Sequence, residues 1–229
     1  MSIEIVTITL PMPMNIALVN CYLLKTDNGF FLIDTGFTNT RNRLETELRL
    51  QGCEKGNFNL IILTHGDFDH TGNAVYLRNR FGARIAMHSG DAGMLENGDM
   101  FWNRKFENRI LMKLMKMLIP FKVENQGKPD LLLEDEASLS NFGLPATVYN
   151  TPGHSTGSIC ILDADGNLFC GDLFTNSTGK ARLNSMLYDH EAGQASYERL
   201  KQRHINRVYA GHGAPFAWEA LQRDSSAGG

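Results

Sequence analysis

Apolar residues in the first part of the chain follow two patterns that are typical of β-strands. Residues 3–10 alternate between apolar and polar positions and include β-branched side chains. Residues 20–25 and 30–34 are two apolar runs, and the short polar segment between them contains an Asn-Gly pair. Because Asn-Gly is a strong signal for a hairpin turn, we expect these two runs to pair as adjacent strands.

Later segments add helices and further strands. Helices are predicted over residues 38–51, 73–81 and 191–203. Short apolar runs predict strands over residues 60–63, 83–88, 131–133, 146–149, 158–163, 168–170 and 207–210. Each half of the chain therefore carries strands followed by a helix. This order predicts an α/β fold and is compatible with a four-layer αββα sandwich.

One segment departs from this alternation, from residue 91 to about residue 128. Methionine is dense there, and the methionines form one apolar helical face together with Ile110, Leu111, Leu114 and Leu118. No low-complexity linker divides the chain, so we expect a single domain over residues 1–229 with a Met-rich helical insertion at about 91–128. Flexible thioethers adapt to apolar partners, so the insertion is a candidate for core, for a lid or for a homodimer interface.

Composition and charge narrow the class of protein. The 229 residues are 42% hydrophobic and 21% charged, which excludes disorder and coiled coil. A net charge of -3 without a basic block gives no electrostatic reason to expect a nucleic acid partner. The longest apolar stretch is too short to span a bilayer, and the N-terminus lacks the basic residues of a signal peptide. Four cysteines without a CxxC pair favour a reduced, cytoplasmic protein.

Candidate chemistry lies in four glycine-bearing loops next to predicted strands. The first loop, Thr-His-Gly-Asp-Phe-Asp-His at 64–70, directly follows the buried apolar run at 60–63. Imidazole and carboxylate are the ligands that borderline divalent metals prefer. Glycine at a strand end allows a tight turn, so side chains from separate strands can converge. Two ions need about three protein ligands each. Seven side chains in these loops are candidates: His65, Asp67, Asp69, His70, His154, Asp172 and His212.

The order of these motifs resembles the metallo-β-lactamase superfamily. The resemblance begins at the Phe-Leu-Ile-Asp-Thr-Gly stretch at 31–36 and ends at His212. It implies an αββα fold, two metal ions and hydrolysis of a small-molecule substrate. Carried over position by position, it implies that the first metal is bound by His65 and His154, the second by Asp69, His70 and His212, with Asp172 as the bridge. We expect Asp34 to support the ligands or a turn rather than to bind metal.

One position departs from the family pattern, because Asp67 stands where the family has its second histidine. Asp67 either binds the first metal or points away from it. A carboxylate ligand would make the first site more anionic and would shift its preference from zinc toward iron or manganese. Flavodiiron proteins of the same superfamily carry a glutamate at this position and hold two irons, but the flavodoxin domain that they use is missing from this sequence.

The chain lacks the distinguishing features of several subfamilies, so we expect a dinuclear hydrolase that cleaves a small-molecule ester, thioester or lactone with a metal-bound hydroxide. Asp69 is the candidate for a ligand that also takes or relays a proton. We expect two divalent ions, with zinc favoured and iron or manganese as alternatives. Two other classes of function stay open: a di-iron redox or oxygen-binding protein of the same fold, and a metal-binding module without turnover.

Overall fold

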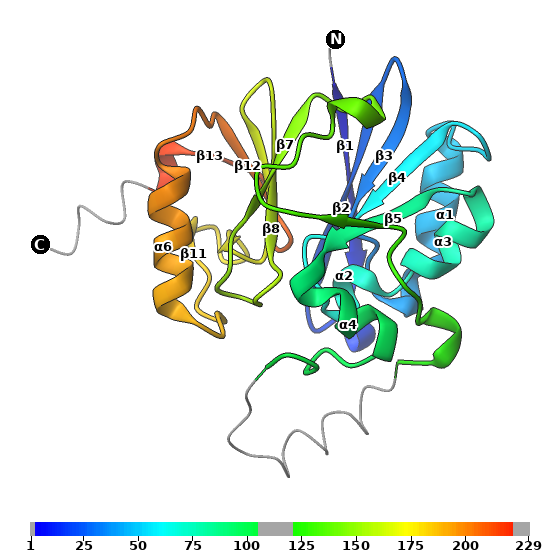
Figure 1. Ribbon diagram of the computed structural model, residues 1–229, viewed down its shortest axis with the longest axis horizontal. Coiled ribbons are helices and arrows are strands. Elements are labelled where there is room, and N and C mark those ends of the chain that lie inside the picture. Colours follow the sequence, from blue (N-terminus) through cyan, green and yellow to red (C-terminus); the bar gives the residue numbers. More distant parts are fainter. Residues whose placement is uncertain (1–2, 105–120, 222–229) are drawn as a thin grey trace, which may run out of the picture.

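The computed structural model describes residues 3–104 and 121–221, and Figure 1 shows their arrangement. Two β-sheets lie face to face, and the outer side of each is covered by helical structure. The αββα sandwich expected from the sequence is therefore confirmed. The expected insertion at about 91–128 begins within helix α4 (Ser89–Asn97). Residues 105–120, which contain most of its apolar face, lie outside the described residues, so the insertion and its dimer role stay predictions.

The first sheet contains six strands in the order of the chain. They are β1 (Glu4–Pro11), β2 (Leu18–Thr26), β3 (Gly29–Ile33), β4 (Phe58–Ile62), β5 (Arg84–His88) and β6 (Leu131–Leu133). The hairpin predicted from the Asn-Gly pair is confirmed, because β2 and β3 pair antiparallel with Thr26 opposite Gly29. From β3 onward the neighbouring strands run parallel.

The second sheet contains five strands in the order β13-β12-β9-β8-β7. They are β7 (Ala146–Asn150), β8 (Ile159–Asp163), β9 (Asn167–Gly171), β12 (Arg207–Ala210) and β13 (Phe216–Ala217). A separate two-stranded sheet is formed by β10 (Phe174–Thr175) and β11 (Arg182–Leu183). The sequence did not predict β10, β11 or β13, since strands of two residues are too short to show a period.

The predicted helices are found at α1 (Arg41–Leu50), α3 (Ala74–Phe81) and α6 (His190–Leu200). Helices α1 and α3 cover the outer face of the first sheet, and α6 covers the second. The sequence did not predict the one-turn helix α2 (Phe68–Thr71). The 3-10 helices are η1 (Pro13–Asn15), η2 (Thr38–Thr40), η3 (Val123–Asn125) and η4 (Ser140–Phe142). In the described part of the chain, no helix is both long and apolar enough to cross a membrane.

Strand β4 shows why an unbroken apolar run is needed at the centre of this fold. Its side chains alternate between the two faces of the sheet. Leu60 and Ile62 enter the core between the sheets, where they join Phe31, Val148 and other apolar residues. Ile61 belongs to the core beneath α1 and α3. Because both faces are buried here, residues 60–63 are all apolar, and polar residues resume at the loop 64–70.

Candidate metal centre

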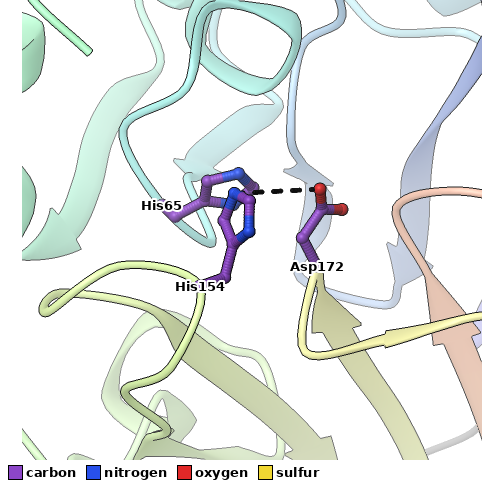
Figure 2. A group of neighbouring side chains, drawn as sticks. All are labelled: His65, His154 and Asp172. Carbon is purple, nitrogen blue, oxygen red and sulfur yellow. Dashed lines mark ion pairs between the residues drawn. The ribbon is translucent and has the colours of Figure 1, made fainter. Parts of the chain in front are cut away.

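The four loops with candidate ligands meet at one end of the sandwich. Loop 64–70 follows β4, and the other three loops follow β7, β9 and β12 of the second sheet. These three strands run in the same direction, because β9 pairs parallel with β12, and β7 and β9 both pair antiparallel with β8. Their carboxyl ends therefore lie on the same side of the sheet. Side chains from both sheets therefore converge. Figure 2 shows three of them, His65, His154 and Asp172, which come from three different loops.

The first ligand group consists of His65, His154 and Asp172. One nitrogen or oxygen atom of each lies within 4.8 Å of those of the other two. His154 Nε2 lies 3.9 Å from Asp172 Oδ2, the contact that is drawn as a dashed line in Figure 2. The side chains of His154 and Asp172 are each 9% exposed, and that of His65 is 1% exposed. Two ligands bonded to one ion at about 2.0–2.2 Å lie roughly 3–4 Å apart, so these separations are suitable for a metal.

The second ligand group consists of Asp69, His70 and His212. Asp69 Oδ2 lies 3.6 Å from His70 Nε2 and 3.3 Å from His212 Nε2. Asp172 lies between the two groups, because its Oδ1 is 3.5 Å from His70 Nε2 and its Oδ2 is 3.5 Å from His212 Nε2. Six of the seven candidates from the sequence are thus brought together, and Asp172 has the position of a shared carboxylate.

All four imidazoles are oriented in the same way. The Nδ1 atom of His154 lies 3.1 Å from the carbonyl oxygen of Met186, and that of His212 lies 2.6 Å from the carbonyl oxygen of Leu18. A carbonyl oxygen only accepts hydrogen bonds, so each Nδ1 carries the hydrogen. The opposite atom, Nε2, then faces the centre, and in the neutral ring it carries the lone pair that would bind an ion. This arrangement is typical of metal-binding histidines.

Asp34 orients the other two histidines. Its Oδ2 accepts hydrogen bonds from His70 Nδ1 and from the hydroxyl group of Thr64, both at 2.8 Å. The Thr64 hydroxyl in turn lies 3.0 Å from Nδ1 of His65, where it accepts the hydrogen of that ring. Asp34 also accepts from the backbone N–H of Thr64 through Oδ1. The expectation that Asp34 supports the ligands is therefore confirmed.

Buried atoms without partners lie at the point where the ligands converge. In the described part of the chain, His65 Nε2, His70 Nε2 and Asp172 Oδ1 are buried and have no hydrogen-bond partner. Unpaired buried polar atoms are costly, and a native protein rarely places three of them side by side without a reason. A cation would satisfy all three, so the residues present fit the metal that the fold implies.

The electrostatics of the centre also favour a cation. Burial lowers the pKa of His70, but the carboxylates of Asp69, Asp34 and Asp172 outweigh it and raise this pKa to about 10. Burial likewise opposes ionisation of His212, yet Asp172 and Asp69 raise its pKa to about 11. His65 differs, because burial and the charges of His70 and His154 hold its pKa well below the usual range. The carboxylates therefore attract positive charge most strongly at the second ligand group.

A glycine permits the close approach of the chain after β12 to this centre. A Cβ atom at Gly211 would lie 2.5 Å from Asp172 Oδ1 and 2.6 Å from His70 Cε1. Neither of these buried side chains can move away without leaving the ligand groups. Only glycine therefore allows the chain to pass directly beneath the ligands and to present His212.

The seventh candidate, Asp67, is engaged by an arginine. Its Oδ2 lies 2.9 Å from His154 Nε2 and 3.8 Å from His65 Nε2. Its Oδ1 lies 2.8 Å from the guanidinium group of Arg104. Burial raises the pKa of the Asp67 carboxyl, but the hydrogen bond with His154 and the charge of Arg104 outweigh this effect and hold the pKa well below its usual range. Asp67 is therefore ionised beside the first ligand group, and its ligation stays a prediction.

Two residues that shape the centre could not be predicted from the sequence. Arg104 pairs with Asp67, and Asp91 is a fully buried carboxylate in α4. Asp91 accepts hydrogen bonds from four donors: Gly66 N at 2.9 Å, Gly157 N at 2.9 Å, Ser155 Oγ at 2.6 Å and Asn103 Nδ2 at 3.0 Å. It therefore joins the loops that carry His65 and His154. No pattern near either residue signals these contacts, because their partners lie far away in the sequence.

Comparison with protein families gives an extended match. The model described as "Metallo-beta-lactamase superfamily" matches residues 15–212. A probable metallo-hydrolase of Methanocaldococcus jannaschii is 28% identical over 85% of this chain and 87% of its own length. A human acyl-coenzyme A thioesterase is 33% identical over 73% of this chain, and a hydroxyacylglutathione hydrolase of Shewanella halifaxensis is 28% identical over 81%. The matches span only 60% and 57% of those two longer relatives.

Solved structures share the fold. A metallo-beta-lactamase family protein from Thermus thermophilus superposes with a TM-score of 0.71 and 24% identity over 97% of this chain and 77% of its own. A protein solved in a di-iron-bound form superposes with a TM-score of 0.68 and 25% identity, over 93% of this chain and 94% of its own. The likeness extends over nearly the whole of this chain.

Proposed function

Because this chain belongs to the metallo-beta-lactamase superfamily, we propose that it is a dinuclear metal-dependent hydrolase of a small-molecule ester, thioester or lactone. One observation carries the proposal. Four imidazoles and two carboxylates from four loops meet at one point, and the imidazoles of both ligand groups direct Nε2 to that point. A lone histidine or aspartate in a turn would not need this arrangement.

The ligand groups define which residues hold the metals. We assign one ion to His65, His154 and Asp172, and the other to Asp69, His70 and His212, with Asp172 shared between them. When bound, divalent ions lower the pKa of water toward neutrality and polarise a carbonyl oxygen. With metal bound, the Nδ1 partners of the imidazoles would keep the remaining hydrogen on Nδ1 and leave Nε2 as the ligating atom. They also exclude bulk water from most of the centre, since four of the six ligand side chains are 9% exposed or less.

Asp69 is the candidate for proton transfer. Its side chain is 16% exposed, whereas that of the other ligand carboxylate, Asp172, is 9% exposed. Asp69 also comes from the first turn of α2 and lies next to His212, itself 17% exposed. A carboxylate at the open side of the centre can accept a proton from the attacking water and return it to the departing alkoxide or thiolate. Asp69 would therefore serve as ligand and as proton acceptor.

The relatives favour thioesters among the candidate substrates. Two of the relatives described above are named as an acyl-coenzyme A thioesterase and as a hydroxyacylglutathione hydrolase. Both of those names describe the cleavage of a thioester. Zinc is the favoured metal because its borderline character suits mixed imidazole and carboxylate ligands, with iron or manganese as alternatives. The structure solved with two irons keeps iron among the alternatives.

The test combines metal analysis with a substrate panel. The full chain is purified, its zinc, iron and manganese contents are measured, and acyl thioesters, esters and lactones are assayed. We expect about two metals per chain and hydrolysis of a thioester that a chelator removes and added metal restores. Two bound metals without turnover on the panel would favour a metal-binding module instead. Two irons with consumption of oxygen would favour the redox alternative.

A further inference from the structure

We propose that Arg104 is a positioning residue that withholds Asp67 from the metal, so that the first ligand group binds a divalent ion more weakly than the second. The inference rests on the proposed metal centre, but it does not depend on which substrate is hydrolysed. It concerns the order in which the two groups take up metal.

The Asp67–Arg104 pair is shielded from water. The two side chains are 9% and 8% exposed, and the carboxylate and the guanidinium group lie 2.8 Å apart. An ion pair in such surroundings is screened much less than an exposed pair. Asp67 directs its other oxygen to His154 Nε2 at hydrogen-bond distance, 2.9 Å. In the second ligand group the corresponding distances between carboxylate oxygens and Nε2 atoms are 3.3 and 3.6 Å. The hydrogen on His154 Nε2 is therefore donated to Asp67, and this hydrogen must leave before the nitrogen can bind an ion.

Arg104 is held in place by the loops of the first ligand group. It donates a hydrogen bond to the carbonyl oxygen of His154 at 3.4 Å. Its neighbour Asn103 donates to Asp91 Oδ1 at 3.0 Å and to the hydroxyl group of Thr156 at 2.7 Å. The segment that carries Arg104 is thus fixed to the same loops that carry His65 and His154. Arg104 cannot turn away from Asp67 without losing its hydrogen bond to His154.

The two ligand groups consequently differ in charge. At the first group, the positive charge of Arg104 cancels the negative charge of Asp67, and the remaining carboxylate is the shared Asp172. At the second group, Asp69 is an additional carboxylate. Within the described residues, its recorded ion pairs are with the imidazoles of His70 and His212 alone. A divalent ion is therefore attracted more strongly to the second group.

The consequence is stepwise loading. As free zinc rises, the second ligand group fills first, and the chain passes through a range in which it holds one ion. The first group fills at higher zinc. Replacing Arg104 by a neutral side chain removes a positive charge near the first group and releases the oxygens of Asp67 as ligands. Both changes strengthen binding at the first group and leave the second group almost unaffected.

The experiment measures zinc per chain after dialysis against zinc buffers of graded free concentration. In the wild-type protein we expect two separate steps. In Arg104→Met the weaker step should move to lower free zinc by about tenfold or more, with the tighter step in place. Arg104→Lys keeps the charge and should resemble wild type. Arg78→Met is the matched control, because Arg78 pairs with Asp130, which is outside both ligand groups. Circular dichroism confirms that each variant is folded.

A double variant shows whether Arg104 withholds Asp67 from the metal or whether Asp67 is already a metal ligand. If Arg104 withholds Asp67, then Asp67→Ala combined with Arg104→Met removes a neutral pair, and the weaker step should stay within about threefold of wild type. A loss of about tenfold or more in this variant would overturn the proposal, since Asp67 would then be a ligand in the wild-type protein. The proposal would also be overturned if Arg104→Met left the weaker zinc-binding step unchanged or moved it to higher free zinc, because Arg104 would then serve only as a loop contact. Absence of zinc from every variant would overturn the metal centre itself and this inference with it.

Discussion

The two ligand groups use the same chemistry but are supported differently. The second group is supported by the first sheet, because Asp34 at the end of β3 holds His70 and the carbonyl oxygen of Leu18 in β2 holds His212. The first group is linked to Asp34 only through Thr64, which contacts His65, and it depends in addition on α4 and the segment after it, through Asp91 and Arg104. The same kinds of ligand can therefore have different affinities, because their supports differ in rigidity and in charge.

The largest effect is expected where the two groups meet. Asp172→Ala removes the carboxylate that lies between them, so we expect the loss of at least one metal and a fall in kcat/KM of about a thousandfold or more. Elemental analysis and the thioester assay measure both effects. Asp165→Ala, in the turn between β8 and β9, is the control and should behave as wild type. Full metal content and normal turnover in Asp172→Ala would contradict the shared-carboxylate assignment.

The pH dependence of zinc binding should separate the two groups. Despite burial, the carboxylates raise the pKa of His70 to about 10 and that of His212 to about 11, so zinc displaces a proton from each at neutral pH. Affinity at the second group should therefore rise about tenfold to hundredfold per pH unit between about pH 7 and 9. In the first group, the pKa of His65 is already well below the usual range. Burial opposes protonation of His154, but Asp67 outweighs this effect and raises its pKa. One histidine instead of two then releases a proton there, so the first group should show a shallower slope. Zinc titrations in metal buffers at several pH values test this, and equal slopes would contradict it.

The same pKa values predict how the stability of the metal-free protein changes with pH. A raised pKa means that the protonated form of His70 or His212 stabilises the fold. This contribution is fully present below the ordinary histidine pKa of 6.5 and is lost as the pH rises through about 10 and 11. Urea unfolding of the metal-stripped chain should therefore show falling stability on the alkaline side. Stability that rises over that range would contradict the assigned charges.

A smaller effect is expected from the support of the second group. Asp34→Asn keeps the size of the side chain but cannot accept from both Thr64 and His70 with the same strength. We expect zinc affinity at the second group to fall about tenfold to hundredfold, as is usual when the partner of a ligating histidine is changed. The competition of a chelator for bound zinc measures this fall. Asp27→Asn, in the exposed turn between β2 and β3, is the control. An unchanged affinity in Asp34→Asn would show that His70 needs no support.

The smallest effect concerns the support of the first group. Asp91→Asn replaces two acceptor oxygens by one and places an amide N–H group against donors such as Gly66 N or Gly157 N. We expect about 2 kcal/mol of lost stability and a weakening of the first group by about tenfold, with the second group little affected. Urea unfolding and zinc dialysis measure these effects, and Glu96→Gln on the same helix is the control. Equal weakening of both groups would contradict a separate support.

Much of the fold could be predicted from local patterns. The Asn-Gly pair predicted the β2–β3 hairpin, and the apolar run at 60–63 predicted a strand buried on both faces, because turn chemistry and alternation act within a few residues. The candidate ligands could be identified because each stands in a glycine-bearing loop at a strand end. Arg104 and Asp91 could not be identified in this way. The partners of Asp91 are 12 to 66 residues away, and only the folded chain brings these groups together.

The division of the ligands between the sheets has a consequence for biosynthesis. Each group takes ligands from both halves: Asp69 and His70 need His212, and His65 needs His154 and Asp172. A nascent chain that has emerged only as far as β6 carries an incomplete set of each and has no high-affinity metal site. In the proposed centre, tight metal binding would therefore require that both halves have been synthesised and packed together. The metal would then stabilise the fold after it is complete and would not nucleate its formation.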